Sequence, residues 1–475
     1  MQSLNPDSPH VRRAGTRSRT AMAMVIACAG FLFLLVLQHQ ARPHAKLGMY
    51  FHSCTSENFM QTVSIEDLRD APFQSLWNLH IQPPALDALR ALLASAWRAP
   101  DPASLLRKVD GSLYLLGAVL YGLAGALIFV WLARLTRPAY AAVAAVLFLA
   151  HPATIFYATL LDTTLLSAVL VTWAYYLLWK LRADSASRIG GLAVALLLLF
   201  FTRSIFQLPA LVVFTVSLVL LGVSRRAVAI FALSCACVMG LYTAKQVALF
   251  NLMSTSSFVG LNLVNSIGDN RIADYFRAVE TFEPEPEANP PLPGVLARRV
   301  KFDGTPNFNN IGYLKVNSEL TGEFKESLKA MSLPALIRSY LRNLRIYFKP
   351  SSDYAPHVIV DHLPWRALYD RVFSFPILNG LLALAGMFWF LRVGRQDYRA
   401  AAGLLLPGLF IFASSVLFEK GENMRFKFFL EPVLFLFMAF EFRAAALRLF
   451  AKRDVRVPVP APAGEGSAGL DAPGS

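Results

Sequence analysis

Two acids and four other polar residues stand beside apolar runs of this 475-residue chain, where they could act on a substrate that is half lipid and half polar. A carboxylate can accept a proton from a hydroxyl group, which makes Glu57 and Asp162 the candidate catalytic residues. Arginine can hold a phosphate through charge-assisted hydrogen bonds. The candidate substrate-binding residues are His80, Arg203, Arg425 and Lys427.

Both acids and Arg203 also have structural explanations. Glu57 could be a solvated loop acid, and Asp162 opens an apolar run, where a carboxylate favours the dipole of a helix. Arg203 ends a short apolar run and could extend its charge to the membrane interface. We place Arg203 near the surface, because a charge at the bilayer centre costs about 2.5–3.5 kcal/mol on insertion scales.

The histidines and the C-terminal basic pair have alternatives too. His80 and His151 have no His-x-x-His or similar spacing, so the sequence identifies no metal site, and structural roles are common for such residues. Arg425 and Lys427 could be ordinary flanking residues. They lie, however, on the expected outer side of the membrane, where positive charge is disfavoured, and this favours a functional role.

The polar stretch at residues 57–84 follows the first apolar run and contains two of these candidates. It holds Glu57, the pair Glu66-Asp67 and the run His80-Ile81-Gln82-Pro83-Pro84. Consecutive prolines cannot continue a helix, so they predict a break and a new element that begins at Ala85.

Two segments have the pattern of helices that lie on a membrane surface. In the first, Leu86, Leu89, Leu93 and Trp97 recur at helical spacing, with Arg90 on another face. The second follows the helix-start signature Ser332-Leu333-Pro334 and places arginines beside an apolar face. Its arginines are Arg338, Arg342 and Arg345.

Composition excludes a soluble nucleic-acid-binding protein. The chain is 55% hydrophobic, and its net charge of +14 comes from Lys and Arg at the ends of apolar runs. That distribution is typical of cytoplasmic loops and of contact with anionic lipids. The 4 cysteines form neither a disulfide framework nor a metal motif.

The apolar runs predict an all-α polytopic membrane protein with about ten spans. The predicted spans are residues 21–37, 113–133, 139–150, 163–179, 189–201, 205–223, 227–249, 372–391, 401–418 and 429–442. The predicted organisation is a tail at 1–20, a membrane domain at 21–249 with an outer loop at 38–111, an outer insertion of mixed structure at 250–370, C-terminal spans at 371–450 and a disordered tail at 451–475.

The charge bias predicts the direction of the spans. When successive spans alternate in direction, the clusters of Lys and Arg all fall on one side of the membrane, which places both termini in the cytoplasm. The two long loops and the tips that carry Asp162, Arg203 and the segment 419–427 then share the outer side.

The order of these features resembles the multi-spanning glycosyltransferases of the C-type fold. The residues that carry the resemblance are Glu57 in the outer loop, the His80–Pro84 run, Leu149-Ala150-His151-Pro152-Ala153 with Asp162 after it, and Gly421-Glu422-Asn423-Met424-Arg425-Phe426-Lys427. The chain is most similar to the bacterial relatives of protein O-mannosyltransferases and aminoarabinose transferases, over roughly residues 20–220. It departs from that pattern in Ser56-Glu57, where the family has an Asp-Glu pair.

The resemblance implies an inverting transfer of a sugar from a polyprenyl-phosphate donor to a periplasmic lipid, glycan or protein, at the bacterial inner membrane. It implies that Glu57 is the general base and that Asp162 orients the site or helps to bind a divalent cation such as Mg or Mn. Arg203, Arg425 and Lys427 are then the residues for the donor phosphate, and the lipid tail lies in a groove between spans.

Two other functions fit the same pattern. A transporter or flippase of lipid-linked sugars predicts related halves and charges across the bilayer centre, and the apolar runs carry few such charges. A catalytically inactive scaffold of the same architecture also remains open because of the Ser56-Glu57 departure.

Overall fold

The computed structural model describes residues 9–41, 55–97, 99–181, 185–268, 292–355, 359–374 and 398–454, with single residues 271, 273, 277 and 357 between them. Within these residues the chain is helical and has no strand, and its one extended pairing there is a bridge between Val300 and Pro306. The predicted all-α class is confirmed for this part of the chain.

The helices and 3-10 turns are, in chain order, α1 (Pro9–Ala41), α3 (Ile65–Asp70), α4 (Pro72–Trp77), α5 (Ala85–Ala96), α6 (Pro102–Leu135), α7 (Pro138–Leu149), α8 (Pro152–Thr159), α9 (Thr164–Lys180), α10 (Ala186–Thr202), α11 (Leu208–Leu220), α12 (Arg225–Phe250), α13 (Val259–Ile267), α15 (Gly294–Ala297), α16 (Gly312–Ala330), α17 (Leu333–Tyr347), η2 (Ser351–Tyr354), η3 (Val360–His362), α18 (Arg366–Ser374), α20 (Tyr398–Phe418), α21 (Asn423–Phe428) and α22 (Glu431–Asp454).

Four described helices are long and apolar enough to cross a membrane: Ser18–Gln40 within α1, and α6, α12 and α20. α7 and α8, bent by 59° at the break between them, would add a fifth if the pair is one span. α9, α10 and α11 are apolar but shorter. These helices indicate a membrane-embedded protein, as the sequence predicts. The count of about ten spans stays a prediction, and the run at 372–391 lies almost wholly outside the described residues.

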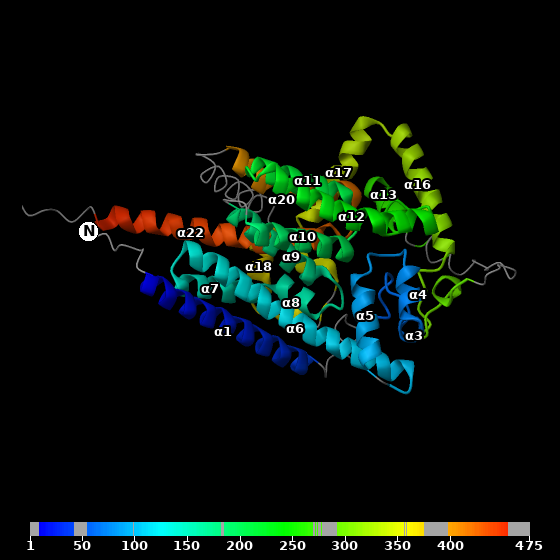
Figure 1. Ribbon diagram of the computed structural model, residues 1–475, viewed down its shortest axis with the longest axis horizontal. Coiled ribbons are helices and arrows are strands. Elements are labelled where there is room, and N and C mark those ends of the chain that lie inside the picture. Colours follow the sequence, from blue (N-terminus) through cyan, green and yellow to red (C-terminus); the bar gives the residue numbers. More distant parts are fainter. Residues whose placement is uncertain are drawn as a thin grey trace, which may run out of the picture.

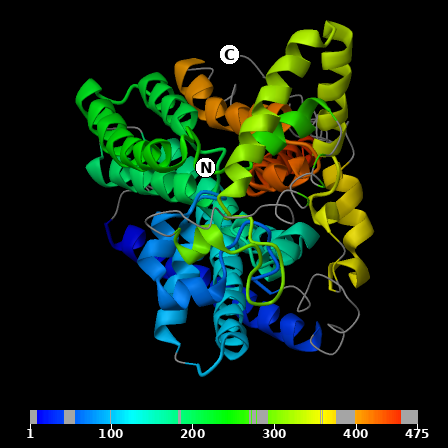
Figure 2. The same cartoon turned by 90° about the vertical axis from the view of Figure 1, so that its right-hand side faces the viewer.

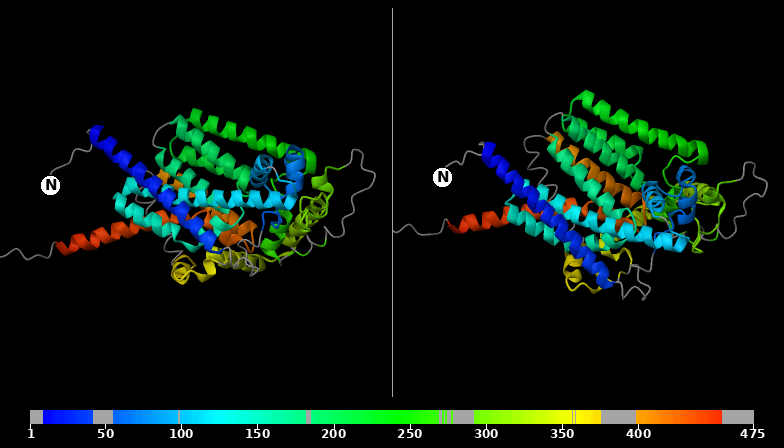
Figure 3. Two further views of the ribbon diagram at one scale, coloured as in Figure 1. Left: turned by 90° about the horizontal axis from the view of Figure 1, so that it is seen from below. Right: turned by 60° about the horizontal axis from the view of Figure 1, so that its bottom comes forward.

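Several helices that are not candidate spans gather at one end of the molecule. In Figure 1, α7 and the last turns of α22 lie toward the end of the molecule at which the chain begins, whereas α3, α4, α5, α13 and α16 gather at the opposite end. Figure 2 looks at that second end and shows the blue helices and the yellow-green α16–α17 hairpin on different sides of it. α1 lies beside α6 in Figure 1 and crosses it at an angle in the left view of Figure 3.

Two glycines of α6 permit this close packing. A Cβ atom at Gly117 would lie 2.3 Å from the carbonyl oxygen of Ala158 in α8, and one at Gly122 would lie 2.3 Å from that of Ala27 in α1. Small residues let membrane helices approach until their backbones touch. Any side chain at either position would therefore push α6 away from its neighbour.

Local sequence explains where the helices begin. α5 begins at Ala85 after the two prolines, and α17 begins at Leu333 after Ser332, so both predicted starts are confirmed. At the start of α6 the Asp101 carboxylate accepts the N–H of Ser104 at 2.8 Å, and Pro102 occupies the first turn. Both features stabilise the N-terminus of a helix.

The predicted organisation stays a prediction. α1 continues to Ala41 and α6 begins at Pro102, and α3, α4 and α5 lie within the predicted outer loop at 38–111. The insertion at 250–370, predicted to be mixed in structure, is helical or irregular wherever it is described. The Glu/Pro-rich run at 282–293 and the tail after residue 454 lie largely outside the described residues.

The predicted topology can be tested with reporter fusions. We expect reporters after Arg137, Arg182 and Arg226 to be cytoplasmic, because Lys and Arg are retained on that side. Gly304 has a φ of +84° and lies in an open turn near Asn309. A short reporter inserted at Gly304 should be outside, as should one near Glu66. A cytoplasmic signal at Gly304 would contradict the shared outer side and the span count together.

Candidate functional site

The candidate site is a cleft with about 1280 Å³ of empty space, partly open to solvent, which we call the polar cleft. Three walls come from distant parts of the chain: the loop at 58–62, the ends of apolar helices at residues 162, 163 and 203, and the segment 419–425 before α22. α13 and Tyr354 of η2 complete it. Its lining residues are Asn58, Phe59, Met60, Gln61, Thr62, Gln82, Leu86, Asp162, Thr163, Arg203, Phe258, Leu261, Asn262, Asn265, Tyr354, Glu419, Lys420, Gly421, Glu422 and Arg425.

Three of the six predicted site residues meet in the wall of this cleft. Arg203 donates from Nη2 to Asp162 Oδ2 at 2.9 Å, and Arg425 Nη2 lies 3.0 Å from the same oxygen. Thr164 donates its hydroxyl to Asp162 Oδ2 at 2.6 Å and its backbone N–H to Oδ1 at 2.8 Å. Asp162 therefore holds the start of α9 as well as two guanidinium groups.

These contacts determine the ionisation of Asp162. Burial is the largest single effect and would raise the pKa of this carboxyl, but Arg425, Arg203 and the two hydrogen bonds from Thr164 together hold the pKa below its ordinary value. A carboxylate with a lowered pKa and saturated oxygens is a weak proton acceptor. The geometry therefore gives Asp162 a positioning role toward the arginines.

The two arginines differ in the donors that they leave available. Arg425 uses every nitrogen: Nε donates to Thr164, Nη1 to Tyr354 and Glu422, and Nη2 contacts Asp162. Arg203 makes its polar contacts with described residues, Asp162 and Thr164, through Nη2 alone. Its remaining donors make Arg203 the better candidate for an anionic ligand.

Glu419 and Glu422 line the cleft and were not singled out from the sequence. Glu422 Oε2 accepts from Arg425 at 2.8 Å, and its Oε1 accepts the hydroxyl of Tyr354 at 2.9 Å. Glu419 is buried and forms no ion pair with any described residue. Burial and then the nearby Glu422 raise the pKa of Glu419 well above its ordinary value. A carboxyl with a raised pKa beside a cleft is suited to general acid–base chemistry.

Amide side chains supply most of the remaining polarity of the cleft. Five of them line it, together with the phenol ring of Tyr354. Amides donate and accept hydrogen bonds, which makes them complementary to a polyhydroxylated ligand. The five are Asn58, Gln61, Gln82, Asn262 and Asn265.

Glu57, the predicted base, lies outside the lining of the polar cleft. Its carboxylate accepts the N–H of Ile65 at 3.1 Å and a 2.6 Å hydrogen bond from Arg90 Nη2, and its side chain is fully buried. Arg90 Nη1 also binds Asp87 at 2.7 Å. Burial raises the pKa of Glu57 against the effect of Arg90 and Lys301. The role of Glu57 as a base stays a prediction that this geometry does not favour.

The buried cluster around Glu57 fixes the first wall of the cleft. Lys301 donates to the carbonyl oxygens of Glu57 and Phe59 at 2.5 and 2.8 Å and to the hydroxyl of Thr62 at 3.1 Å. Burial lowers the pKa of Lys301 to about 8. The loop at 58–62 is thus held by a cation from the segment after α15. Sequence reasoning placed Arg90 on a separate face of its helix and did not identify this cluster.

Two other predicted binding residues are also absent from the cleft lining. His80 is fully buried, its Nδ1 lies 2.9 Å from Ser257 Oγ, and burial lowers its pKa to about 3, so the ring is neutral. Lys427 donates to the carbonyl oxygen of Lys349 at 2.6 Å and lies 3.5 Å from Glu431. His151 caps α8 by accepting the N–H of Ala153 at 3.1 Å. The geometry favours structural roles for all three.

The residues present do not fit a divalent cation at Asp162. Within the described ranges, no three His, Cys, Asp or Glu side chains are grouped so that they could hold a metal ion. Two guanidinium groups already contact Asp162 Oδ2, and their charge opposes a second cation there.

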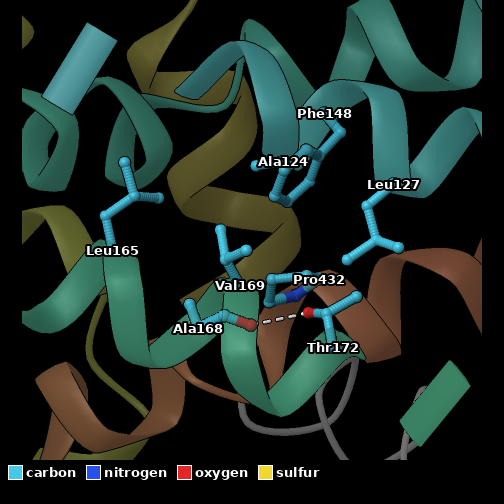
Figure 4. Close-up of a pocket in the computed structure, with 8 residues that line it drawn as sticks. All are labelled: Ala124, Leu127, Phe148, Leu165, Ala168, Val169, Thr172 and Pro432. Carbon is cyan, nitrogen blue, oxygen red and sulfur yellow. Dashed lines mark hydrogen bonds between the residues drawn. The ribbon is translucent and has the colours of Figure 1, made fainter. Parts of the chain in front are cut away.

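A second pocket, inside the helix bundle, offers no such chemistry. Figure 4 shows its eight lining residues, from α6, α7, α9 and α22, around about 210 Å³ of empty space. The one side-chain hydroxyl there, on Thr172, donates to the carbonyl oxygen of Ala168 at 2.7 Å. This pocket is apolar, so the polar cleft remains the candidate site.

Comparison with known proteins adds no assignment. No family model, no curated protein and no solved structure matches this chain.

Proposed function

We propose that the chain is an integral-membrane glycosyltransferase that moves a sugar from a polyprenyl-phosphate donor to an acceptor hydroxyl with inversion. The observation that carries the proposal is the polar cleft, where Arg203 has donors to spare, Glu419 has a raised pKa, and an apolar groove continues from the cleft. The proposed setting is the bacterial inner membrane, with about ten spans, cytoplasmic termini and a periplasmic cleft.

The apolar groove supports a donor with a lipid chain. This groove, which we call the α11–α20 groove, holds about 890 Å³ of empty space and shares Asn262 and Glu419 with the polar cleft. Ser204 and Ile205, which follow Arg203 directly, line it. A phosphate held by Arg203 would thus place its polyprenyl chain against apolar residues of the groove.

The residues of the cleft suggest a single displacement. In our proposal, ionised Glu419 takes the proton of the acceptor hydroxyl while that oxygen bonds to the anomeric carbon of the donor. The bond from this carbon to the phosphate oxygen breaks, and the polyprenyl phosphate leaves with its electron pair. Arg203 stabilises the developing charge on the phosphate, and Asp162 keeps Arg203 and Arg425 in place. One displacement inverts the configuration.

Replacing Arg203 by lysine tests the donor site. The variant keeps the charge but loses the planar fork, so we expect the affinity for a polyprenyl-phosphate sugar to fall by about tenfold. Binding can be measured with purified protein in lipid nanodiscs. Arg338→Lys on the exposed face of α17 is the matched control and should bind normally.

Unchanged affinity in Arg203→Lys would contradict the donor site. Donor binding with no transfer to any acceptor would favour a transporter or an inactive scaffold over an enzyme.

A further inference from the structure

We infer that α17 lies in the surface of the membrane and binds anionic phospholipids there. Its exposed leucine and isoleucine side chains contact hydrocarbon, and the arginines beside them hold lipid phosphates. The distribution of apolar, basic and buried residues around this one helix carries the inference, which does not depend on the proposed transferase function.

The outward side of α17 is apolar where a water-facing helix would be polar. Leu333, Ile337 and Leu341 are 68%, 48% and 57% exposed. Because they recur every four residues, they form one stripe along the helix, which we call the apolar stripe. An exposed stripe of this kind is unfavourable in water and favourable against the hydrocarbon of a membrane surface.

The inward side of α17 is polar at the same spacing. Ser339, Asn343 and Tyr347 are its buried residues. Ser339 donates its hydroxyl to the carbonyl oxygen of Ile267 at 2.9 Å, and Asn343 donates to that of Ser266 at 2.8 Å, both at the end of α13. α17 thus reverses the arrangement that is usual in soluble proteins, in which a helix buries its apolar side.

α16, the other helix of the same hairpin, has the usual arrangement. It buries Tyr313 and Leu320, and its exposed side is mainly charged. The exposed charged residues are Lys315, Glu319, Lys325, Glu326 and Lys329. In Figures 1 and 2 the hairpin extends beyond the neighbouring helices, so both of its helices have an outward side. The contrast indicates that α16 faces water and α17 faces lipid.

The contacts of α17 place it at the end of a candidate membrane span. Asn343 donates to the carbonyl oxygen of Val416 at 3.1 Å, and the rings of Tyr347 and Phe412 meet edge to face with centroids 5.1 Å apart. Both partners belong to α20, which ends at Phe418. Since the end of a span lies where hydrocarbon meets the head groups, α17 is at the depth of an interfacial helix.

Three arginines, which we call the arginine edge, border the apolar stripe. Arg338, Arg342 and Arg345 are exposed and lie about 100° further round the helix than the stripe. Arg338 and Arg342 donate to the carbonyl oxygens of Pro334 and Gly268, and within the described part of the chain no acid pairs with any of the three. Arginine binds phosphate through charge-assisted hydrogen bonds. The uncompensated charge favours a head group with a net negative charge.

Photolabelling with two lipid probes tests the inference. One is phosphatidylglycerol and the other phosphatidylcholine, each with a diazirine on its acyl chain close to the head group. Each is added in a small, equal amount to phosphatidylcholine nanodiscs that hold the full-length protein. We expect both probes to label the apolar stripe, and the phosphatidylglycerol probe to label it about tenfold more, because it is held by the arginine edge.

A double substitution of the arginine edge identifies the binding site. Arg338→Gln with Arg345→Gln should lower labelling of α17 by the phosphatidylglycerol probe about tenfold and leave labelling by the phosphatidylcholine probe unchanged. Lys315→Gln with Lys325→Gln removes the same charge from α16 and is the matched control, which should label normally. All four side chains are exposed, so both variants should fold.

Labelling of α12 shows whether the protein has inserted. α12 is a candidate span whose Leu233 and Leu241 are 70% and 68% exposed, so both probes should label it. Label on α12 without label on α17 would overturn the inference and assign the apolar stripe to a protein partner or to a second copy of this chain. Equal labelling of α17 by the two probes, or equal labelling in the arginine variant and the lysine control, would overturn the anionic head group. Sugar transfer enters none of these measurements, so the proposed function is tested separately.

Discussion

Replacing Arg90 by methionine is expected to lower the free energy of unfolding by about 3–5 kcal/mol, which is the usual effect of removing one partner from a buried ion pair. Arg90 is fully buried and binds Glu57 and Asp87 at 2.6 and 2.7 Å. The substitution leaves both carboxylates in the interior without their cation. Unfolding by heat or denaturant in detergent, followed by intrinsic fluorescence, measures the change.

Arg107→Met in α6 is the control for this experiment. Arg107 is exposed, so its loss should change stability little. Glu57→Gln should also destabilise, because Arg90 then lacks one of its two acids. A Glu57→Gln variant with normal stability and abolished transfer would instead show that Glu57 is the base, as the resemblance implies.

Replacing Glu419 by glutamine should lower transfer by about 10²–10⁴-fold, the usual contribution of a general base. Glutamine keeps the size of the side chain and its hydrogen bonds but cannot accept the proton. The raised pKa of Glu419 also predicts a pH dependence. The base must be ionised, so the rate of the natural protein should rise with pH until it passes that raised pKa. Transfer at equal protein level and a series of pH values measures both effects.

Glu66→Gln is the control for Glu419→Gln. Glu66 is partly exposed and pairs with Arg298 at 3.1 Å, outside the polar cleft, so transfer should be close to normal. Near-normal transfer in Glu419→Gln, together with its loss in Asp162→Asn, would contradict the assignment and move the base to Asp162.

The sequence predicted best those features that depend on neighbouring residues. The prolines at 83 and 84 predicted the start of α5, and Ser332 predicted the start of α17, because both signals act within one turn. Asp162, Arg203 and Arg425 lie near the ends of apolar runs. The alternation of the predicted spans across the membrane was enough to predict that all three lie on its outer side. The structure brings these three together.

The features that were missed depend on contacts between distant residues. Arg90 reads as a polar position on an amphipathic helix, and Glu57, one of its two acidic partners, lies 33 residues away. A buried cation is rare, so burial was not the expectation for an arginine. Glu419 has no distinctive neighbours in sequence, and its chemistry arises from burial at the junction of a cleft and a groove. His80 and Lys427 have polar partners that only the fold supplies.

The loop at 58–62 is synthesised long before Lys301, the residue that binds it. Lys301 lies 244 residues after Glu57, whose carbonyl oxygen it binds. At ordinary elongation rates the loop is made roughly 10–50 s before this lysine. Late in that interval the nascent chain contains Glu57, Arg90 and Asp110. It does not yet contain Lys301, the cation that fixes the loop. A chain released early, by a premature stop codon or by proteolysis before residue 301, would therefore have an unformed cleft, and under the proposed function it would not bind lipid-linked sugar.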